Sequence, residues 1–141
     1  QMRKIPDTGY RTLSLVVYAV FSLTILIRLI NTKKFNLKNT FWSSFLISAG
    51  SFFMLTRMHE RYFAPALPFL LLLPFKKYKI LFIYLMFSII HFLNLYHWWW
   101  YPNIPWLFNM LTNFFLIYLL SAIFFSLFIY LVYEYFHQPV E

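Results

Sequence analysis

The chain has 141 residues, of which 62% are hydrophobic and 11% are charged, and its formal net charge is +8. Soluble domains use charged residues at roughly a quarter of their positions, so this composition predicts a membrane protein. The positive charge does not indicate nucleic-acid binding, because lysine and arginine stand in short clusters at the ends of apolar runs. Cysteine is absent, which excludes disulfides and thiolate metal sites.

Five apolar segments predict an all-α, polytopic membrane helical bundle, one transmembrane unit over residues 1–141. They cover residues 12–30, 41–56, 62–75, 80–96 and 106–133. The first carries Arg28 near its end, where a long side chain can snorkel to the interface. The third is short and contains Pro65, Pro68 and Pro74, so a regular helix there is kinked or begins only after Pro68. The last segment is long enough to cross the bilayer with a tilt.

Lysines gather in the connections after the first and third segments, and this clustering predicts the orientation. Each connection holds three: Lys33, Lys34 and Lys38 in one, Lys76, Lys77 and Lys79 in the other. The positive-inside tendency places both connections in the cytoplasm, and the hairpin at 57–61 and the loop at 97–105 on the extracytoplasmic side. Basic residues in the hairpin and before the first segment leave the inverted orientation open as an alternative.

Four ionisable side chains stand together between the second and third segments: Arg57, His59, Glu60 and Arg61. Such residues are costly at the edge of hydrocarbon, and they usually line a polar site. The two arginines suit a phosphate or pyrophosphate, which guanidinium groups bind through bidentate hydrogen bonds. His59 can donate to a leaving oxygen or orient an acceptor hydroxyl, while Glu60 fixes an arginine or the imidazole. Alternatively, the arginines anchor helix ends at lipid phosphates, although this does not account for His59.

The loop at 97–106 is the second biased segment, with four consecutive candidates for substrate binding: His97, Trp98, Trp99 and Trp100. Aromatic faces there, together with Tyr62 of the hairpin, can stack on a sugar ring or a lipid headgroup. The alternative is an ordinary belt of aromatic residues at the membrane interface.

Other polar residues of the apolar segments give weaker signals. His91 and Asn94 can share one helix face and are expected to form a polar contact with a neighbouring helix. Asn109 and Asn113, four residues apart, can face the same polar cavity. Glu134 falls in the C-terminal tail, where a solvated side chain is expected.

The run from Phe53 to Phe69, FMLTRMHERYFAPALPF, resembles the MHERY…PALPFL signature of bacterial membrane mannosyltransferase-like proteins. These belong to the GT-C class of glycosyltransferases, which use polyprenyl- or dolichyl-phosphate sugars. The run is also similar to the shorter Val-His-Glu-Lys motif of dolichyl-phosphate-glucose glucosyltransferases. The resemblance covers about residues 53–73 and implies that residues 58–62 lie near an outward-facing active site.

The resemblance implies inverting transfer of a sugar from a polyprenyl-phosphate donor to an acceptor hydroxyl, with His59 and Glu60 in the catalytic site and Arg57 and Arg61 on the lipid phosphate. The family's catalytic aspartate lies in a loop after the first span, whereas Asp7 is the only aspartate here and precedes the first segment. We therefore expect the C-terminal portion of such an enzyme, inactive alone, with the aspartate supplied by the N-terminal part or by a partner chain.

The remaining expectations concern partners and location. The lipid-linked sugar acts as co-substrate and membrane lipids surround the chain, which we expect in a bacterial plasma membrane with its site on the extracytoplasmic face. No cofactor is assigned, and no metal ligand set is assigned; a divalent ion would need ligands from outside this chain. The alternative function is a non-catalytic, lipid-binding or structural subunit of a larger membrane complex.

Overall fold

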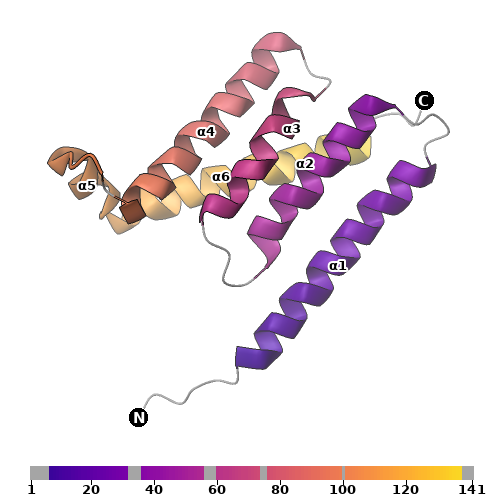
Figure 1. The fold of residues 1–141 in the computed structure, drawn as a ribbon, viewed down its shortest axis with the longest axis horizontal. Helices are drawn as coiled ribbons and strands as arrows, with labels where there is room; N and C mark the ends of the chain where they lie inside the picture. Colours follow the sequence, from indigo (N-terminus) through magenta and orange to yellow (C-terminus); the bar gives the residue numbers. More distant parts are fainter. Residues whose placement is uncertain (1–6, 32–35, 56–59, 74–75, 100, 138–141) are drawn as a thin grey trace.

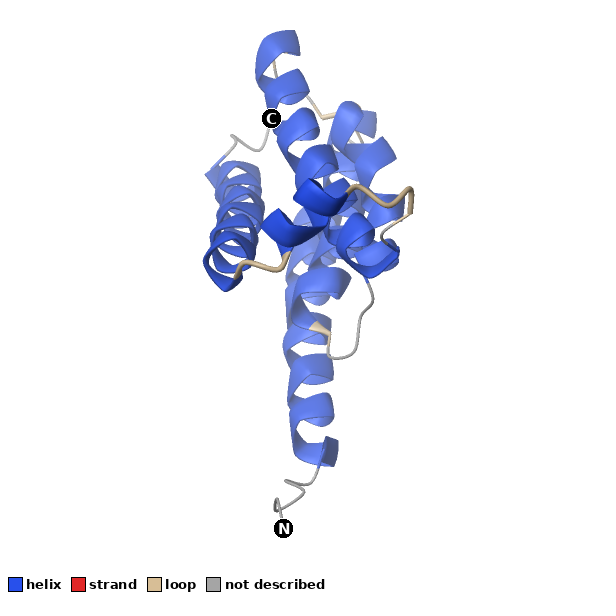
Figure 2. Cartoon of the chain, turned by 90° about the vertical axis from the view of Figure 1, so that its left-hand side faces the viewer, coloured by secondary structure: helices blue, strands red, loops and turns tan. Residues whose placement is uncertain are grey.

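The computed structural model describes residues 7–31, 36–55, 60–73, 76–99 and 101–137 (Figure 1). Their elements are α1 (Asp7–Asn31), α2 (Leu37–Met54), the 3-10 helix η1 (Glu60–Ala66), α3 (Leu67–Leu71), α4 (Lys77–Trp99), α5 (Pro105–Leu111) and α6 (Phe114–His137). Only helices and loops are present over these ranges (Figure 2). The predicted all-α class is confirmed.

Within the described chain, α1, α4 and α6 are long and apolar enough to cross a membrane. Each exposes large apolar side chains on its outer face, for example Leu15 in α1, Phe82 in α4 and Phe125 in α6. An apolar surface of this extent is unusual for a protein in water and suits contact with lipid. These helices give the chain the dimensions and surface of a polytopic membrane protein.

Helix α2 is the centre of the bundle, and it packs against α1, η1, α3 and α6. Its buried residues include Trp42, Phe45 and Leu46, together with the polar Ser43, whose hydroxyl shares a hydrogen bond of 2.8 Å with the hydroxyl of Tyr135 on α6. Because α2 is surrounded by other helices, it does not need the uniformly apolar surface of the three lipid-facing helices.

The proline-containing third segment is interrupted, as the sequence predicts. Residues 60–66 form η1 with Pro65 inside it, and α3 then extends only from Leu67 to Leu71. The α-helix begins one residue before Pro68 instead of after it, because a proline in the first turn has no intrahelical hydrogen bond to lose. Pro74 lies outside the described residues.

The segment expected over 106–133 is divided into α5 and α6, with the break at Thr112 and Asn113. The Asn113 side-chain oxygen accepts a hydrogen bond of 3.0 Å from the backbone N–H of Phe115, which caps the start of α6. The Thr112 hydroxyl donates to the backbone carbonyl of Asn109 over 2.8 Å at the end of α5. Side-chain hydrogen bonds to the backbone therefore end one helix and begin the next within a continuous apolar run.

The helix ends gather in two groups (Figure 1). The C-terminal ends of α2 and α4 lie with the first turns of α6, since residues from all three line one cavity. At the opposite end of the bundle, Arg28 near the end of α1 and Lys79 near the start of α4 both contact the last turns of α6. The ends of α2 and α4, which precede the predicted hairpin and the aromatic loop in the chain, therefore lie at one end of the bundle, and the start of α4, with Lys79, lies at the other.

Candidate functional site

The structure describes three of the nine predicted site residues with their side chains: Tyr62, His97 and Trp99. Arg57, His59 and Trp100 lie outside the described residues, as do the side chains of Glu60, Arg61 and Trp98. The backbone of Glu60 and Arg61 forms the first turn of η1. The site is therefore built from the residues that flank the motif on each side.

Phe63 anchors the chain immediately after the motif. Its side chain is fully buried, and its ring is stacked on Phe87 of α4 with a centroid distance of 5.4 Å and an interplanar angle of 11°. A tilted contact at 4.7 Å joins it to Phe124 of α6. Aromatic pairs of this kind add to the free energy gained by burial, so they fix the start of η1 in the core. The neighbouring Tyr62 is 44% exposed.

The anchor also adjoins the buried histidine of α4. The ring of His91 is 4% exposed and lies 5.5 Å from the ring of Phe63, in a tilted arrangement. His91 is thus packed against the aromatic core next to the motif. Asn94, one turn further along α4, has a different place and lines a cavity.

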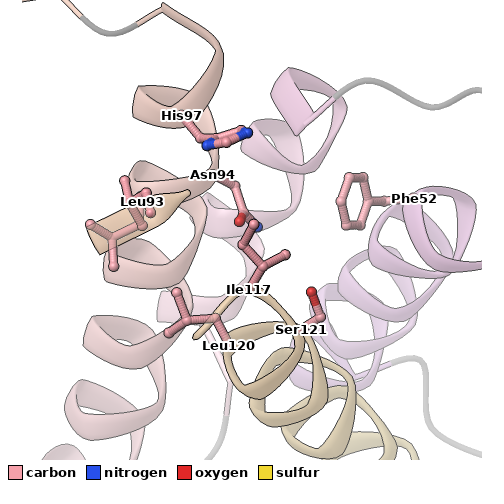
Figure 3. Close-up of a pocket in the computed structure, with 8 residues that line it drawn as sticks. Phe52, Leu93, Asn94, His97, Ile117, Leu120 and Ser121 are labelled. Atoms are coloured by element: carbon pink, nitrogen blue, oxygen red, sulfur yellow. The ribbon is translucent and has the colours of Figure 1, made fainter. Parts of the chain in front are cut away.

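This cavity has a volume of about 330 Å³ and lies between α2, α4, α5 and α6 (Figure 3). Its eight lining residues are Phe52, Leu93, Asn94, His97, Leu111, Ile117, Leu120 and Ser121. Apolar side chains form most of the wall, and an amide, an imidazole and a hydroxyl supply the polar groups. A space of this size with a few polar groups is typical of a small-molecule site.

One residue of the cavity wall contacts the residue that follows the motif. Phe52 lies in the last turn of α2, shortly before the motif, and lines the cavity. Its ring also contacts the ring of Phe63, directly after the motif, edge to face at 5.5 Å. The cavity is therefore one ring contact away from Phe63, the first residue after the motif.

Tyr96 holds the loop between α4 and α5. Its hydroxyl donates to the backbone carbonyl of Pro102 over 2.9 Å and accepts from the backbone N–H of Ile104, also over 2.9 Å. The Tyr96 ring is buried with Leu107 and Leu111 of α5. These contacts place α5 beside the cavity, where Leu111 forms part of the wall.

The predicted aromatic platform is divided between two environments. His97 lines the cavity, whereas Trp99 is 72% exposed and lies outside the cavity wall. Tyr101 and Trp106 are also strongly exposed. Exposure of this kind fits the belt at the membrane interface, the alternative interpretation of this loop. Within the described residues, only His97 joins the loop to the cavity.

Two expectations for asparagines are wrong. Neither Asn109 nor Asn113 is among the residues that line the cavity, and both are exposed. The side chain of Asn113 is instead used to cap α6. The sequence reasoning assumed one continuous helix over both residues, and the break at 112–113 removes the shared face.

The expectation of a solvated Glu134 is also wrong, because α6 continues to His137. The Glu134 carboxylate pairs with the Lys79 ammonium of α4 at 3.3 Å and accepts a hydrogen bond from the hydroxyl of Tyr130. This ion pair joins the start of α4 to the end of α6.

Arg28, predicted to reach the membrane interface, contacts the C-terminal end of α6. Its guanidinium donates to the backbone carbonyl of Phe136 over 3.0 Å and lies 5.1 Å from the ring centre of Tyr135. A cation is favourable there, because the last carbonyls of a helix carry partial negative charge. Arg28 and Lys79 therefore fasten the bundle at the end opposite the cavity.

Comparisons with known proteins return no match, whether with family models, curated proteins or solved structures. Among the described residues, no group of three or more His, Asp or Glu side chains is placed to hold a metal ion. The functional interpretation therefore depends on the sequence motif and on the geometry around it.

Proposed function

We propose that this chain is part of an integral-membrane glycosyltransferase that moves a sugar from a polyprenyl-phosphate donor to an acceptor hydroxyl. The observation that supports this most strongly is the position of the MHERY motif. Aromatic side chains anchored in the core flank it on both sides, and one of them lines a cavity with mixed apolar and polar walls. The motif supplies groups for a phosphate, and the cavity offers space for a small organic group.

In this proposal a base outside the described residues removes the proton of the acceptor hydroxyl. The acceptor oxygen then attacks the anomeric carbon while the bond from that carbon to the phosphate oxygen breaks, so the configuration is inverted. Arg57, Arg61 and His59 stabilise the negative charge that grows on the departing polyprenyl phosphate. Glu60 orients one of these groups by accepting a hydrogen bond.

The proposed site faces the extracytoplasmic side. This orientation is supported by the lysine-rich connections, which adjoin the end of the bundle held together by Arg28 and Lys79. The base is the aspartate of another part of the enzyme or of a partner chain, and a bacterial plasma membrane is the proposed location.

The test is sugar transfer by the complete enzyme in membranes. We expect His59→Ala and Arg61→Ala each to reduce the rate of transfer by at least about tenfold, because each removes a group that stabilises the leaving phosphate. The matched controls are His137→Ala and Lys38→Ala, whose side chains are exposed near the opposite end of the bundle. Normal transfer by stably inserted His59 and Arg61 variants would reduce the hairpin to an interfacial anchor.

A second candidate is a non-catalytic structural or lipid-binding subunit, and the surface of α1 favours it. Helix α1 packs mainly on α2 and exposes apolar side chains such as Leu13, Val20 and Ile27 along its length. Such a face suits lipid or another membrane helix. If the complete assembly transfers no sugar from any polyprenyl-phosphate donor, this second function is favoured.

A further inference from the structure

Two polar side chains point into the cavity from neighbouring helices. The amide of Asn94 on α4 and the hydroxyl of Ser121 on α6 both face the space between these helices, and Phe52 lies across from them (Figure 3). Within the described ranges, neither side chain takes part in a hydrogen bond with the protein. In the chain alone Asn94 is half-buried and Ser121 is exposed, so both groups are available to a ligand in the cavity.

The location of these groups makes a polar occupant favourable. Asn94 and Ser121 lie on the two helices α4 and α6, which are long and apolar enough to span the membrane. Where such helices are surrounded by lipid, an amide or hydroxyl is costly unless it forms hydrogen bonds. Polar residues inside spanning segments are for this reason usually functional.

The rest of the wall restricts what the occupant can be. None of the eight lining residues carries a permanent charge, so the cavity offers nothing to balance an ionic ligand. Phe52, Leu93, Ile117 and Leu120 form an apolar wall, which favours a ligand with an apolar face over water alone. A ring with hydroxyl groups along one edge and C–H groups on its face meets both requirements.

We propose that this cavity binds a neutral, hydroxyl-bearing ring, with Asn94 and Ser121 as its hydrogen-bonding residues and Phe52 against its apolar face. The choice of a sugar as that ring rests on the proposed function. The assignment of Asn94, Ser121 and Phe52 does not, since all three lie outside the MHERY motif. His97, at the same wall, adds a further polar contact.

The hydroxyl-bearing ring can belong to a free sugar or to the headgroup of an amphiphile in the bilayer. Three probe compounds distinguish these two ligands. The full chain in phosphatidylcholine nanodiscs is incubated with radiolabelled methyl β-D-glucopyranoside, n-octyl β-D-glucopyranoside or n-octanol. Saturable binding is measured against protein-free nanodiscs. Binding of the methyl glucoside identifies a free sugar, and binding of the octyl glucoside alone identifies a membrane-borne headgroup. Equal binding of octanol and octyl glucoside, or no saturable binding of either glucoside, overturns the proposal.

Substitutions test the named residues. We expect Asn94→Leu and Ser121→Ala each to weaken glucoside binding by about three- to tenfold, the usual effect of one lost hydrogen bond. The matched controls are Asn109→Leu and Ser126→Ala, which change exposed residues outside the cavity and leave binding unchanged. Circular dichroism of each variant in nanodiscs verifies folding, and Ser121→Ala, the smallest change, keeps the test valid if Asn94→Leu fails to fold. Equal behaviour of Ser121→Ala and Ser126→Ala contradicts the assignment.

The result of the glucoside-binding experiment can be told apart from the result of the sugar-transfer experiment. Glucoside binding that depends on Asn94 and Ser121, in a protein that transfers no sugar, overturns the proposed function and supports the cavity assignment. Normal sugar transfer by the Asn94 and Ser121 variants, with unchanged glucoside binding, overturns the cavity assignment and leaves the function in place.

Discussion

Gly50 of α2 lies close against Phe21 of α1, and its substitution gives a quantitative test of the bundle. A Cβ atom added at Gly50 would lie 2.6 Å from Cε1 and 3.1 Å from Cδ1 of Phe21 on α1. Favourable contacts between carbon atoms lie at about 3.5–4.0 Å. The Phe21 ring cannot move freely, because it also packs against Phe128 of α6 at a centroid distance of 6.1 Å.

The expected magnitude has two parts of opposite sign. Overpacking of a core by one added carbon typically costs about 1–3 kcal/mol. Replacing a helical glycine by alanine gains about 0.5–1 kcal/mol, because the unfolded chain has less freedom to lose. Gly50→Ala is therefore expected to lower the free energy of unfolding by about 0–2.5 kcal/mol.

Gly9 provides the matched control, since a Cβ atom there meets nothing within 4 Å among the described residues. Gly9→Ala lies in the first turn of α1, so it is expected to gain no more than about 0.5–1 kcal/mol, without a packing cost. The assay is reversible unfolding of both variants in detergent micelles, followed by circular dichroism. A Phe21→Leu background relieves the clash and makes the two glycine substitutions more alike. Equal stability of Gly50→Ala and Gly9→Ala would refute the close packing of α1 on α2.

Three further predictions concern hydrogen bonds at the two ends of the bundle. Tyr96→Phe removes both hydrogen bonds to the loop before α5, so we expect the local free energy of unfolding to fall by about 1–3 kcal/mol and amide hydrogen exchange at Ile104 to become faster. Unchanged exchange at Ile104 would argue against these hydrogen bonds. Asn113→Ala removes the N-terminal cap of α6, which we expect to lower the free energy of unfolding by about 1 kcal/mol and to speed amide hydrogen exchange in the first turn of that helix. Unchanged exchange in that turn would contradict the capping role of Asn113. Arg28→Met keeps the aliphatic length of the side chain but loses the donor to the Phe136 carbonyl, so we expect the free energy of unfolding to fall by about 1–2 kcal/mol. Proteolysis at the end of α6 should then be faster, and a wild-type cleavage rate would disprove that Arg28 holds this end of the helix.

The class of fold was predictable because it depends on composition and on the length of apolar runs. The interruption of the third segment was predictable for a similar reason, since the conformational limits of Pro65 and Pro68 act locally. The break at Asn113 was missed because hydropathy continues across it. The local signal was present, however: Asn113 stands where an N-cap residue stands, directly before the run that forms α6.

The cavity could be predicted only in part. His97 and the polar character of Asn94 are visible in the sequence, but Phe52 and Ser121 are common residues of apolar helices and carry no local signal. They become neighbours only when α2, α4 and α6 pack together. The partners of Arg28 and Glu134 were missed for the same reason, because 108 and 55 residues separate them from Phe136 and Lys79.

The bond from Arg28 to the Phe136 carbonyl also has a consequence for biosynthesis. The two residues are 108 positions apart, and ribosomes add about 5–20 residues each second, so about 5–20 seconds pass between their syntheses. During this interval the Arg28 guanidinium of α1 cannot donate to the Phe136 carbonyl, its acceptor in the finished fold. Helix α6 thus completes the lateral assembly of α1, and a ribosome stalled before residue 136 leaves a chain in which α1 lacks this contact.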